Sequence, residues 1–579
     1  MTKGETLWLS ALVRHTRGVF SSAGRHGVKT IALVVLLLGA LSVVARIADL
    51  SVVTSSSYLS QSRRSVTAAV PNVARTSVTN LSVETQEQLD RLIEQRRRPP
   101  YVYKSDKTKE ACYAERDMGI ITVVRDSAKT FCANGGWDRS KQAPVSPTRA
   151  TKVTTFHIKA GVKGATFQNL MLDFVNASIF APIKTIADDG YLHDPRFVFS
   201  TELINCVCDE LATYYRKLSG NKERAAEQLW MDRVASLPRK KTPEPLICSD
   251  KRPQGTKQSA WDFVKNPTAA PDEHETVIFE DPVVLLTRKD DHNPFFQLSN
   301  TVNAWIMLKA LEWNITRTRV IHLDGGFVMP YDDLQKNMLG PNFEIIDGAT
   351  LVGKRVHFRG DVLLPPIERL GPIMEHLGVD EPCHDSELVR TFRAESLLTF
   401  NITPEVEREL GVTRIRPMYV TVITRRPYAG RKLQRIWLNE DEVMRNMRKD
   451  YNNLSVQFRS VDYVELTLHE QMTTTIESDM IVSMHGAGLV NVLWTRPMTT
   501  VVEIFPKKRI RYGYRNICQH VGCDWHEFRG GEDIGKMRDP NTKNKRIPYA
   551  EWKDFFHPLF QQTYGAFEEQ QAVLRGEAS

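Results

Sequence analysis

Several well-known functional motifs are missing from this sequence of 579 residues. No block of Lys and Arg and no basic motif interleaved with aromatics stands out, which argues against nucleic-acid binding despite a formal net charge of +8. No G-x-S-x-G nucleophile elbow occurs, which disfavours an oxyanion hole of the α/β-hydrolase type. No G-x-G-x-x-G is followed by an acidic residue, which disfavours a soluble Rossmann dehydrogenase. The sequence also lacks D-x-D, through which many enzymes bind a divalent metal.

Long apolar runs are scarce as well, and residues 31–44 form a nearly uninterrupted one with several basic residues before it. This run is shorter than the roughly 20 residues that span a bilayer, but Lys29 and Arg46 can snorkel to the membrane surface. The basic flank predicts a cytoplasmic tail over residues 1–29 and a transmembrane signal anchor over residues 30–48. A cleaved signal peptide and a buried core helix are the alternatives.

The segment after this run has the composition of a linker. Residues 49–100 are rich in Ser, Thr, Gln and Arg and poor in aromatics, which predicts a stem whose end forms a short helix. N-x-S/T sequons, the acceptor sites of N-glycosylation, occur at Asn80, Asn176, Asn314, Asn401 and Asn453. The anchor places the rest of the chain in the lumen of the secretory pathway.

Cysteine is also rare, and all eight cysteines follow the predicted anchor: Cys112, Cys132, Cys206, Cys208, Cys248, Cys383, Cys518 and Cys523. An even number in an oxidising lumen predicts disulfides, whose connectivity stays open. Zinc ligands and plain buried thiols are the alternatives. Neither Cys206-x-Cys208 nor Cys518-x4-Cys523 has a second Cys/His pair at zinc-finger spacing.

From Arg416 onward, strand and helix patterns alternate regularly. The predicted strands are Tyr419–Thr424, Leu454–Phe458, Met480–Met484 and Thr500–Phe505. Helices are predicted to begin at Asn439, at the capping box of Thr467 and Glu470, and at Leu489. This alternation predicts a parallel sheet with right-handed crossovers, which is a Rossmann-like domain.

The turn His485-Gly486-Ala487-Gly488 lies between a predicted buried strand and the next predicted helix. Glycines at such a turn let the backbone approach a ligand closely, and free N–H groups at a helix start favour an anion such as a diphosphate. The turn is therefore a candidate phosphate site, with a purely structural turn as the alternative.

The stretch S-D-M-I-V-S-M-H-G-A-G-L-V-N-V-L-W, followed by V-V-E-I-F-P, resembles the C-terminal signature of glycosyltransferase family 61. Further matches lie at Thr424-Arg425-Arg426, at Arg435-Ile436-Trp437-Leu438-Asn439-Glu440 and at Asn293-Pro294-Phe295-Phe296-Gln297. The resemblance covers roughly residues 277–529.

The resemblance implies an α/β fold of GT-B type, in which two Rossmann-like domains face a cleft after a single transmembrane helix. It implies an acceptor-side domain over residues 101–412 and a nucleotide-sugar-binding domain over residues 413–579 with a C-terminal tail. The implied activity is inverting transfer of xylose or N-acetylglucosamine from a UDP-sugar donor to a glycan or glycoprotein acceptor. The implied location is the Golgi or endoplasmic reticulum membrane.

The same resemblance points to a donor site that needs no metal, since a cationic side chain and a helix start can replace the ion that D-x-D would hold. We therefore expect no obligatory cofactor. The candidate donor-binding residues are Arg425, Arg426, His485, Gly486, Ala487, Gly488, Leu489, Asn491 and, as a ribose contact or a buried structural carboxylate, Glu503.

The catalytic base is harder to assign. Val283–Leu286 is a predicted strand, and Asn293-Pro294 is predicted to open a long apolar helix that in the family carries a His and an Asp. This chain has Phe296 and Asn300 at those positions. Asp291 and His292 are the nearest candidates for a base. A catalytically silent, glycan-binding homologue is the alternative function.

Overall fold

The structure, a computed structural model, describes residues 76–77, 81–96, 102–131, 133–134, 136–138, 143–145, 151–158, 161–173, 178–180, 196–198, 204–205, 276–286, 293–323, 330–351, 353–366, 373, 383–426, 433–535 and 542–577. The predicted tail and anchor lie outside these residues, as does most of the predicted stem. Within the described ranges, no helix is both long and apolar enough to cross a membrane.

The C-terminal half is built on a five-stranded, entirely parallel sheet in the order β19-β18-β20-β21-β22. Its strands are β18 (Met418–Ile423), β19 (Val456–Val461), β20 (Met480–Met484), β21 (Thr500–Ile504) and β22 (Asp524–Phe528). The predicted parallel sheet is thereby confirmed. β22 was not predicted, because it is a half-buried edge strand of sequence DWHEF with no run of apolar residues.

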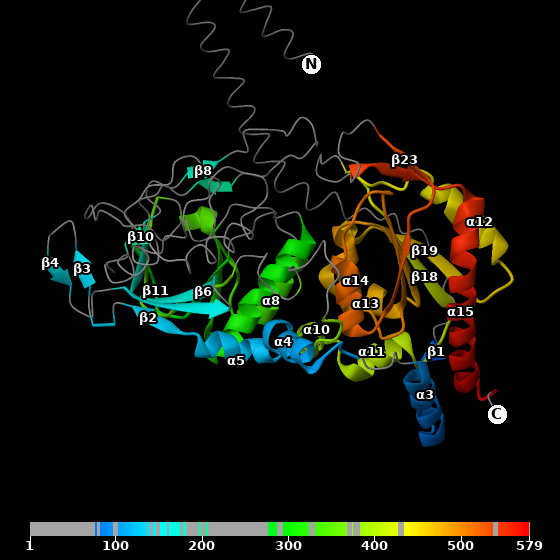
Figure 1. Ribbon diagram of the computed structural model, residues 1–579, viewed down its shortest axis with the longest axis horizontal. Helices are drawn as coiled ribbons and strands as arrows, with labels where there is room; N and C mark the ends of the chain where they lie inside the picture. The colour runs from blue at the N-terminus through cyan, green and yellow to red at the C-terminus, as the bar shows by residue number, and fades with distance from the viewer. Residues whose placement is uncertain are drawn as a thin grey trace, which may run out of the picture. The chain divides into compact units, whose positions relative to one another are not determined.

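Both faces of this sheet are covered, which explains why every residue of β18, β20 and β21 is buried. One face packs against α12 (Glu440–Asp450) and α15 (Tyr549–Arg575), and the other against α13 (Leu468–Glu477), α14 (Gly513–Val521) and the 3-10 helix η6 (Ala487–Trp494) (Figure 1). Successive strand residues alternate between the two cores: Ile481 and Val501 face one, while Val482 and Val502 face the other.

The local predictions for this half hold with three differences, the first of which is that the strand predicted over Leu454–Phe458 forms at Val456–Val461. The capping box of Thr467 and Glu470 is present in full. The element after the glycine turn, however, is 3-10 rather than α-helical. Asn439 stands at the start of α12 as predicted but does not cap it, because its side-chain oxygen accepts a hydrogen bond from Ile547 N at 2.9 Å.

The C-terminal tail was predicted without bounds, and the described residues near the end of the chain form α15, whose Trp552, Phe556 and Phe560 are fully buried against the sheet. The end of the predicted stem is helical, as expected, over α3 (Val83–Arg96). This helix is packed rather than free, because Leu89 is buried against Val573 and Leu574 of α15. Figure 1 shows α3 beside the C-terminal end of α15.

The N-terminal half carries a seven-stranded sheet in the order β14-β13-β12-β16-β6-β5-β2. The first four strands are mutually parallel and the last three join them antiparallel, so the second Rossmann-like sheet that the resemblance implied is only partly parallel. The strands are β2 (Lys129–Phe131), β5 (Lys152–Ile158), β6 (Gly161–Gln168), β12 (Val283–Leu286), β13 (Arg319–His322), β14 (Ile346–Asp347) and β16 (Val362–Leu364).

A second sheet of four strands has the order β10-β7-β15-β11, formed by β7 (Leu170–Asp173), β10 (Ile204–Asn205), β11 (Thr276–Phe279) and β15 (Arg355–Phe358). Two-stranded pairs complete the described strands: β1 (Thr76–Ser77) with β17 (Arg414–Ile415), β3 (Gly136–Asp138) with β4 (Ala143–Val145), β8 (Ser178–Phe180) with β9 (Arg196–Val198), and β23 (Glu532–Ile534) with β24 (Asn544–Arg546).

The helix α8 (Pro294–Leu311) starts as predicted: Asn293 Oδ1 accepts a hydrogen bond from Phe295 N at 3.1 Å, and Pro294 occupies the first turn. Almost all of α8 is buried. It packs against α5 (Gly119–Asp126), α9 (Pro330–Leu339) and α10 (Glu387–Thr399). α4 (Asp106–Arg116) packs against α5, and α11 (Pro404–Gly411) packs against α13. The short 3-10 turns are η2 (Ile315–Arg317), η3 (Gly348–Leu351) and η5 (Tyr463–Glu465).

One hydrophobic core joins the two predicted domains. The ring of Phe295 on α8 lies 5.3 Å from that of Tyr514 on α14, centroid to centroid. Trp494, at the end of η6, packs 5.8 Å from Tyr331 of α9 and donates a hydrogen bond to Ser396 of α10 at 3.0 Å. The start of α8 therefore lies against the elements that follow the glycine turn.

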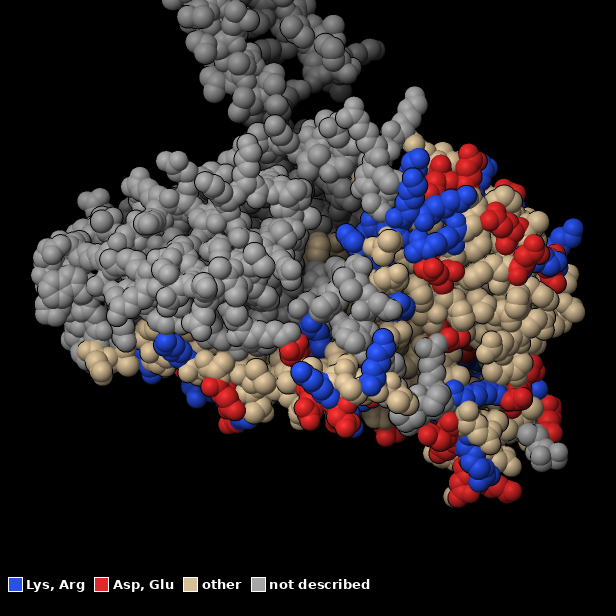
Figure 2. All heavy atoms as spheres, viewed as in Figure 1, with Lys and Arg blue, Asp and Glu red and all other residues tan. Residues whose placement is uncertain are grey.

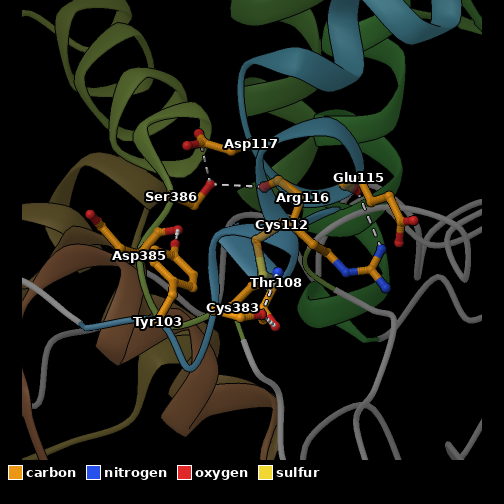
Figure 3. The surroundings of a disulfide bond; sticks show 10 residues. Tyr103, Thr108, Cys112, Glu115, Arg116, Asp117, Cys383, Asp385 and Ser386 are labelled. Carbon is orange, nitrogen blue, oxygen red and sulfur yellow. Dashed lines mark hydrogen bonds between the residues drawn. A yellow bond between two sulfur atoms is a disulfide. The ribbon is translucent and has the colours of Figure 1, made fainter. Parts of the chain in front are cut away.

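Two disulfides are present among the described residues, which confirms disulfide pairing for these four cysteines. Cys112 of α4 is bonded to Cys383, just before α10, across 271 residues of sequence (Figure 3). Next to it, Ser386 donates a hydrogen bond to the carbonyl of Arg116 at 3.0 Å. The second disulfide joins Cys518 to Cys523, so these two cysteines are bonded to each other rather than to zinc. The other four cysteines lie outside the described residues.

Candidate functional site

The strand order places the predicted phosphate turn at a particular point of the parallel sheet. In chain order the strands run 2-1-3-4-5, so the connections leave β18 and β20 in opposite directions. Ligands of doubly wound sheets bind outside the carboxyl ends of the strands at such a switch point. Arg425 follows β18 and the His485–Gly488 turn follows β20, so both lie at this point.

The guanidinium of Arg425 lies directly against Gly486. A Cβ atom on Gly486 would stand 1.5 Å from Arg425 Nη1 and 2.6 Å from Cζ. The φ of Gly486 is −178°, an extended value open to any residue. Glycine is therefore needed at this position for the space that Arg425 occupies and not for its backbone conformation.

Gly488 is less confined, since a Cβ there would meet Ile423 Cγ2 at 3.4 Å, an ordinary contact. Its carbonyl accepts a hydrogen bond from Asn491 Nδ2 at 3.0 Å. Asn491 and Leu489 are both buried, and the backbone N of Leu489 donates a hydrogen bond to the carbonyl of Gly486 at 3.0 Å. Ala487 is the first residue of η6.

His485 is held in place by Glu503 and Trp525. Its Nδ1 is hydrogen-bonded to Glu503 Oε1, and Trp525 Nε1 donates to Glu503 Oε2 at 2.9 Å. The ring of His485 also stacks on Phe505, 4.9 Å away. Glu503 is completely buried, so in this structure its carboxyl group orients His485; contact with a ribose remains a prediction.

Burial sets the protonation of this pair. It raises the pKa of Glu503 to about 8, and burial together with the neighbouring arginines pushes the pKa of His485 well below its ordinary value. At neutral pH the Glu503 carboxyl is therefore protonated and donates a hydrogen bond to Nδ1, so the single imidazole proton is on Nε2. His485 is then a neutral hydrogen-bond donor.

Arginines gather around His485. Arg509, Arg435, Arg425 and Arg511 all act to lower its pKa. The Nε of Arg435 donates to the carbonyl of His485 at 2.8 Å, and Arg435 has a left-handed φ of 57°, which is uncommon outside glycine. Figure 2 shows a group of Lys and Arg side chains on the described part of this half, with acidic side chains beside it. The carboxyl edge of the sheet is therefore strongly positive.

Arg435 was predicted only as part of a motif and not as a site residue, and Arg509 and Arg511 were not predicted from the sequence. Contrary to the expectation that no block of Lys and Arg stands out, a basic cluster lies directly after β21, at Lys507, Lys508, Arg509 and Arg511, and it was the available signal. Because β21 ends at the same edge as β18 and β20, these side chains belong to the same region.

Other predicted site residues lie elsewhere. Arg426 is exposed. Burial raises the pKa of Glu440 and of Asp462, and the charge of Arg426 opposes that rise in both. Asp291 and His292 lie outside the described residues, so their role as base stays a prediction. Phe296 and Asn300 on α8 are partly and fully buried, respectively.

The Glu503–His485 pair gives a pH-dependent prediction for stability. The folded-state pKa of Glu503, about 8, exceeds its unfolded value of 4.5, so the folded state holds the extra proton and loses stability as pH rises toward 8. His485, neutral when folded, opposes this trend only below its unfolded pKa of 6.5.

We therefore expect the free energy of unfolding to fall as pH rises from 6.5 to about 8 in the native protein, and to change less in Glu503→Gln, whose amide still donates to Nδ1. Urea unfolding at both pH values, in both proteins, measures this. Parallel pH profiles would contradict the protonated carboxyl.

Comparison with known proteins bears on this site directly. Residues 356–502, from β15 to β21, match the model of the family described as Glycosyltransferase 61. Over these residues the chain is similar to glycosyltransferase family 61. This match confirms the resemblance and contains Arg425, Arg435, the glycine turn and η6.

The relatives include three proteins named EGF domain-specific O-linked N-acetylglucosamine transferase. The chicken (Gallus gallus) protein is 32% identical over 165 residues, which cover 28% of each chain. The dog (Canis lupus familiaris) protein is 26% identical over 233 residues, 40% of this chain and 41% of its own. The frog (Xenopus laevis) protein is 27% identical over 273 residues, 45% of this chain and 48% of its own. The similarity thus spans less than half of these relatives.

Proposed function

We propose that this protein is an inverting glycosyltransferase that moves a sugar from a UDP-sugar donor to a glycoprotein acceptor in the secretory pathway. The observation that carries the proposal is the contact between Arg425 and Gly486 at the switch point of a parallel sheet, inside the glycosyltransferase 61 match. That edge offers a guanidinium, free backbone amides and a positive field to a nucleoside diphosphate.

In this proposal the protein's own residues neutralise the departing diphosphate. Inversion proceeds by a single displacement at the anomeric carbon, in which negative charge develops on the leaving phosphate. Arg425 and Arg435 supply positive charge, the N–H groups at the start of η6 supply donors, and neutral His485 offers a further donor. With D-x-D absent from the sequence, no obligatory divalent ion is expected. The base that accepts the proton of the acceptor hydroxyl is proposed to be Asp291 or His292.

The proposal also covers the identity of the sugar and acceptor, and the arrangement and location of the protein. The names of the relatives favour N-acetylglucosamine over xylose as the sugar, and a protein hydroxyl as the acceptor. We propose a GT-B arrangement, in which the acceptor enters from the side of α8, and a type II anchor over residues 30–48 in the Golgi or endoplasmic reticulum membrane.

A catalytically silent, glycan-binding homologue is the second candidate. It is favoured by one observation: the first turns of α8, from Pro294 to Thr301, carry no titratable side chain. Turnover separates the two candidates, because a silent homologue would bind UDP without hydrolysing or transferring a donor sugar.

A donor screen tests the proposal. UDP release should be fastest with UDP-N-acetylglucosamine, slower with UDP-xylose and UDP-arabinose, and retained in the presence of EDTA because Arg425 and backbone amides hold the diphosphate. Release should require a folded glycoprotein acceptor. Loss of activity in EDTA that manganese restores would contradict the metal-independent site, and UDP binding without turnover of any donor would favour the silent homologue.

A further inference from the structure

A pocket of about 750 Å³ lies at the opposite end of α8 from the proposed donor site. It is formed where parallel strands begin: Pro282 precedes β12, Asp361 precedes β16, and Arg317 lies just before β13. The start of α8 reaches Tyr514, which packs 5.4 Å from His485, whereas Glu312 at the other end of the helix lines the pocket. A helix of 18 residues separates its ends by about 27 Å. The pocket is therefore distinct from the donor site.

The lining of this pocket has the composition of a sugar-binding surface. Half-buried Trp313 contributes an indole ring, and Gln168 and Asn169 contribute amides. Asn169 Oδ1 is bonded to His357 Nε2 at 2.9 Å, and Glu280 pairs with Arg359 at 2.7 Å. A pyranose ring has an apolar C–H face that stacks on an aromatic ring and a rim of hydroxyls that pairs with planar donors and acceptors. The volume is within the usual range for small-molecule sites.

Asn314, the residue after Trp313, belongs to the same lining and to the sequon Asn314-Ile315-Thr316. Its side chain is exposed, and its Oδ1 accepts hydrogen bonds from the backbone N (3.0 Å) and hydroxyl (2.8 Å) of Thr316. Its Nδ2, the atom that N-glycosylation modifies, takes part in no hydrogen bond within the described part of the chain. A sugar can therefore be attached there while the local turn is kept.

We propose that Asn314 carries an N-linked glycan whose first sugars occupy this pocket and stack on Trp313. In the attachment step, Nδ2 forms a bond to the anomeric carbon of a lipid-diphosphate-linked oligosaccharide and gives up one proton, while the carbon–oxygen bond to the diphosphate breaks and the lipid diphosphate leaves with the electron pair. The inference rests on the secretory placement in the proposed function.

A second sequon supplies an internal control. Asn453 is also exposed, lies in the turn after α12 and is not among the residues that line the pocket. A glycan there projects into solvent. The two sites can therefore be compared within one protein molecule, with the same enzyme and at the same time.

The test uses the full chain expressed through the secretory pathway, with glycopeptide mass spectrometry and timed digestion of the native protein by peptide N-glycosidase. Asn314 should be glycosylated, and its glycan should be released roughly tenfold more slowly than that of Asn453, as expected for one aromatic stacking contact. After denaturation the two rates should be equal. Equal rates in the native protein, or an unmodified Asn314 beside a modified Asn453, would overturn the proposal. If neither is modified, the secretory placement fails and the proposal fails with it.

Variants of the pocket residues test whether the pocket is what slows release of the Asn314 glycan. Trp313→Ala should bring the release rate at Asn314 close to that at Asn453, and Trp313→Phe should preserve most of the protection. Because Trp313 also packs against the hydrophobic core, Gln168→Ala provides a second change at an exposed side chain. This variant should speed release a few-fold, the effect of one lost hydrogen bond. Full protection in both folded alanine variants would overturn the proposal.

Discussion

Replacement of Arg425 by alanine should lower kcat/KM for the donor by roughly 10- to 150-fold while leaving the melting temperature nearly unchanged. The guanidinium stands at the carboxyl end of β18 against Gly486, where we place the departing diphosphate. A charge-assisted hydrogen bond to such a group contributes about 1.5–3 kcal/mol. Steady-state kinetics with the donor found in the screen, together with thermal unfolding, measure both effects.

Arg445→Ala is the matched control for this change. Arg445 lies exposed on α12 and makes none of the hydrogen bonds or ion pairs in the described part of the chain. The Arg445→Ala substitution removes the same charge away from the carboxyl end of β18 and from Gly486, so activity should remain at the native level. An equal loss of activity in both variants would show that net charge, rather than the placement of Arg425, is responsible.

Replacement of Asp479 by alanine should destabilise the protein by roughly 3–5 kcal/mol, because it leaves buried guanidinium groups without their counter-charge. Asp479 accepts hydrogen bonds from Arg416 Nη1 at 2.7 Å and Nη2 at 2.9 Å, from Arg496 Nη2 at 2.7 Å and from Tyr419 N at 2.8 Å. Burial alone would raise its pKa, but these arginines hold the pKa below its ordinary value.

Urea unfolding measures this loss, with Asp554→Ala as control. Asp554 is exposed on α15, and its replacement should change stability by no more than about 0.5 kcal/mol. Near-native stability of Asp479→Ala would contradict the structural role that we assign to this carboxylate. The S-D-M-I-V-S-M-H-G-A-G motif therefore has two roles. Its first residues, which include Asp479, lie at the amino end of β20 and stabilise the fold, and its last residues form the candidate site.

The buried strands of the C-terminal sheet could be predicted because each is a run of apolar, often β-branched residues bounded by helix caps. Met480–Met484 and Val283–Leu286 were predicted with the bounds that the structure has. β22 was not predicted, because a half-exposed edge strand carries no such run of apolar residues. The antiparallel strands of the N-terminal sheet were not predicted, for a different reason. Their pairing partners lie far apart in sequence, as for β6 with β16, and the residue pattern of a single strand does not encode its register.

The candidate site could be predicted in its central turn but not in its surroundings. Gly486 and Arg425 were predicted from motif and position, and the structure brings them into contact. The roles of Glu503 and Arg435 depended on tertiary contacts: a buried carboxyl facing His485, and a left-handed backbone that aims Arg435 at the same turn. Neither a burial environment nor a φ value can be read from a residue's type alone.

Calorimetric titration of UDP into Gly486→Ala protein tests the central claim most directly. The extended φ of Gly486 accepts alanine, but the new Cβ would stand 1.5 Å from Arg425 Nη1, so the guanidinium must move away. UDP affinity should fall roughly tenfold or more, as in Arg425→Ala, and the double variant should lose little beyond either single one because both act through the same side chain. Gly565→Ala on α15, where a Cβ meets nothing within 4 Å, should bind UDP like the native protein. A folded Gly486→Ala protein with native UDP affinity would contradict a diphosphate site formed by Arg425 at this turn.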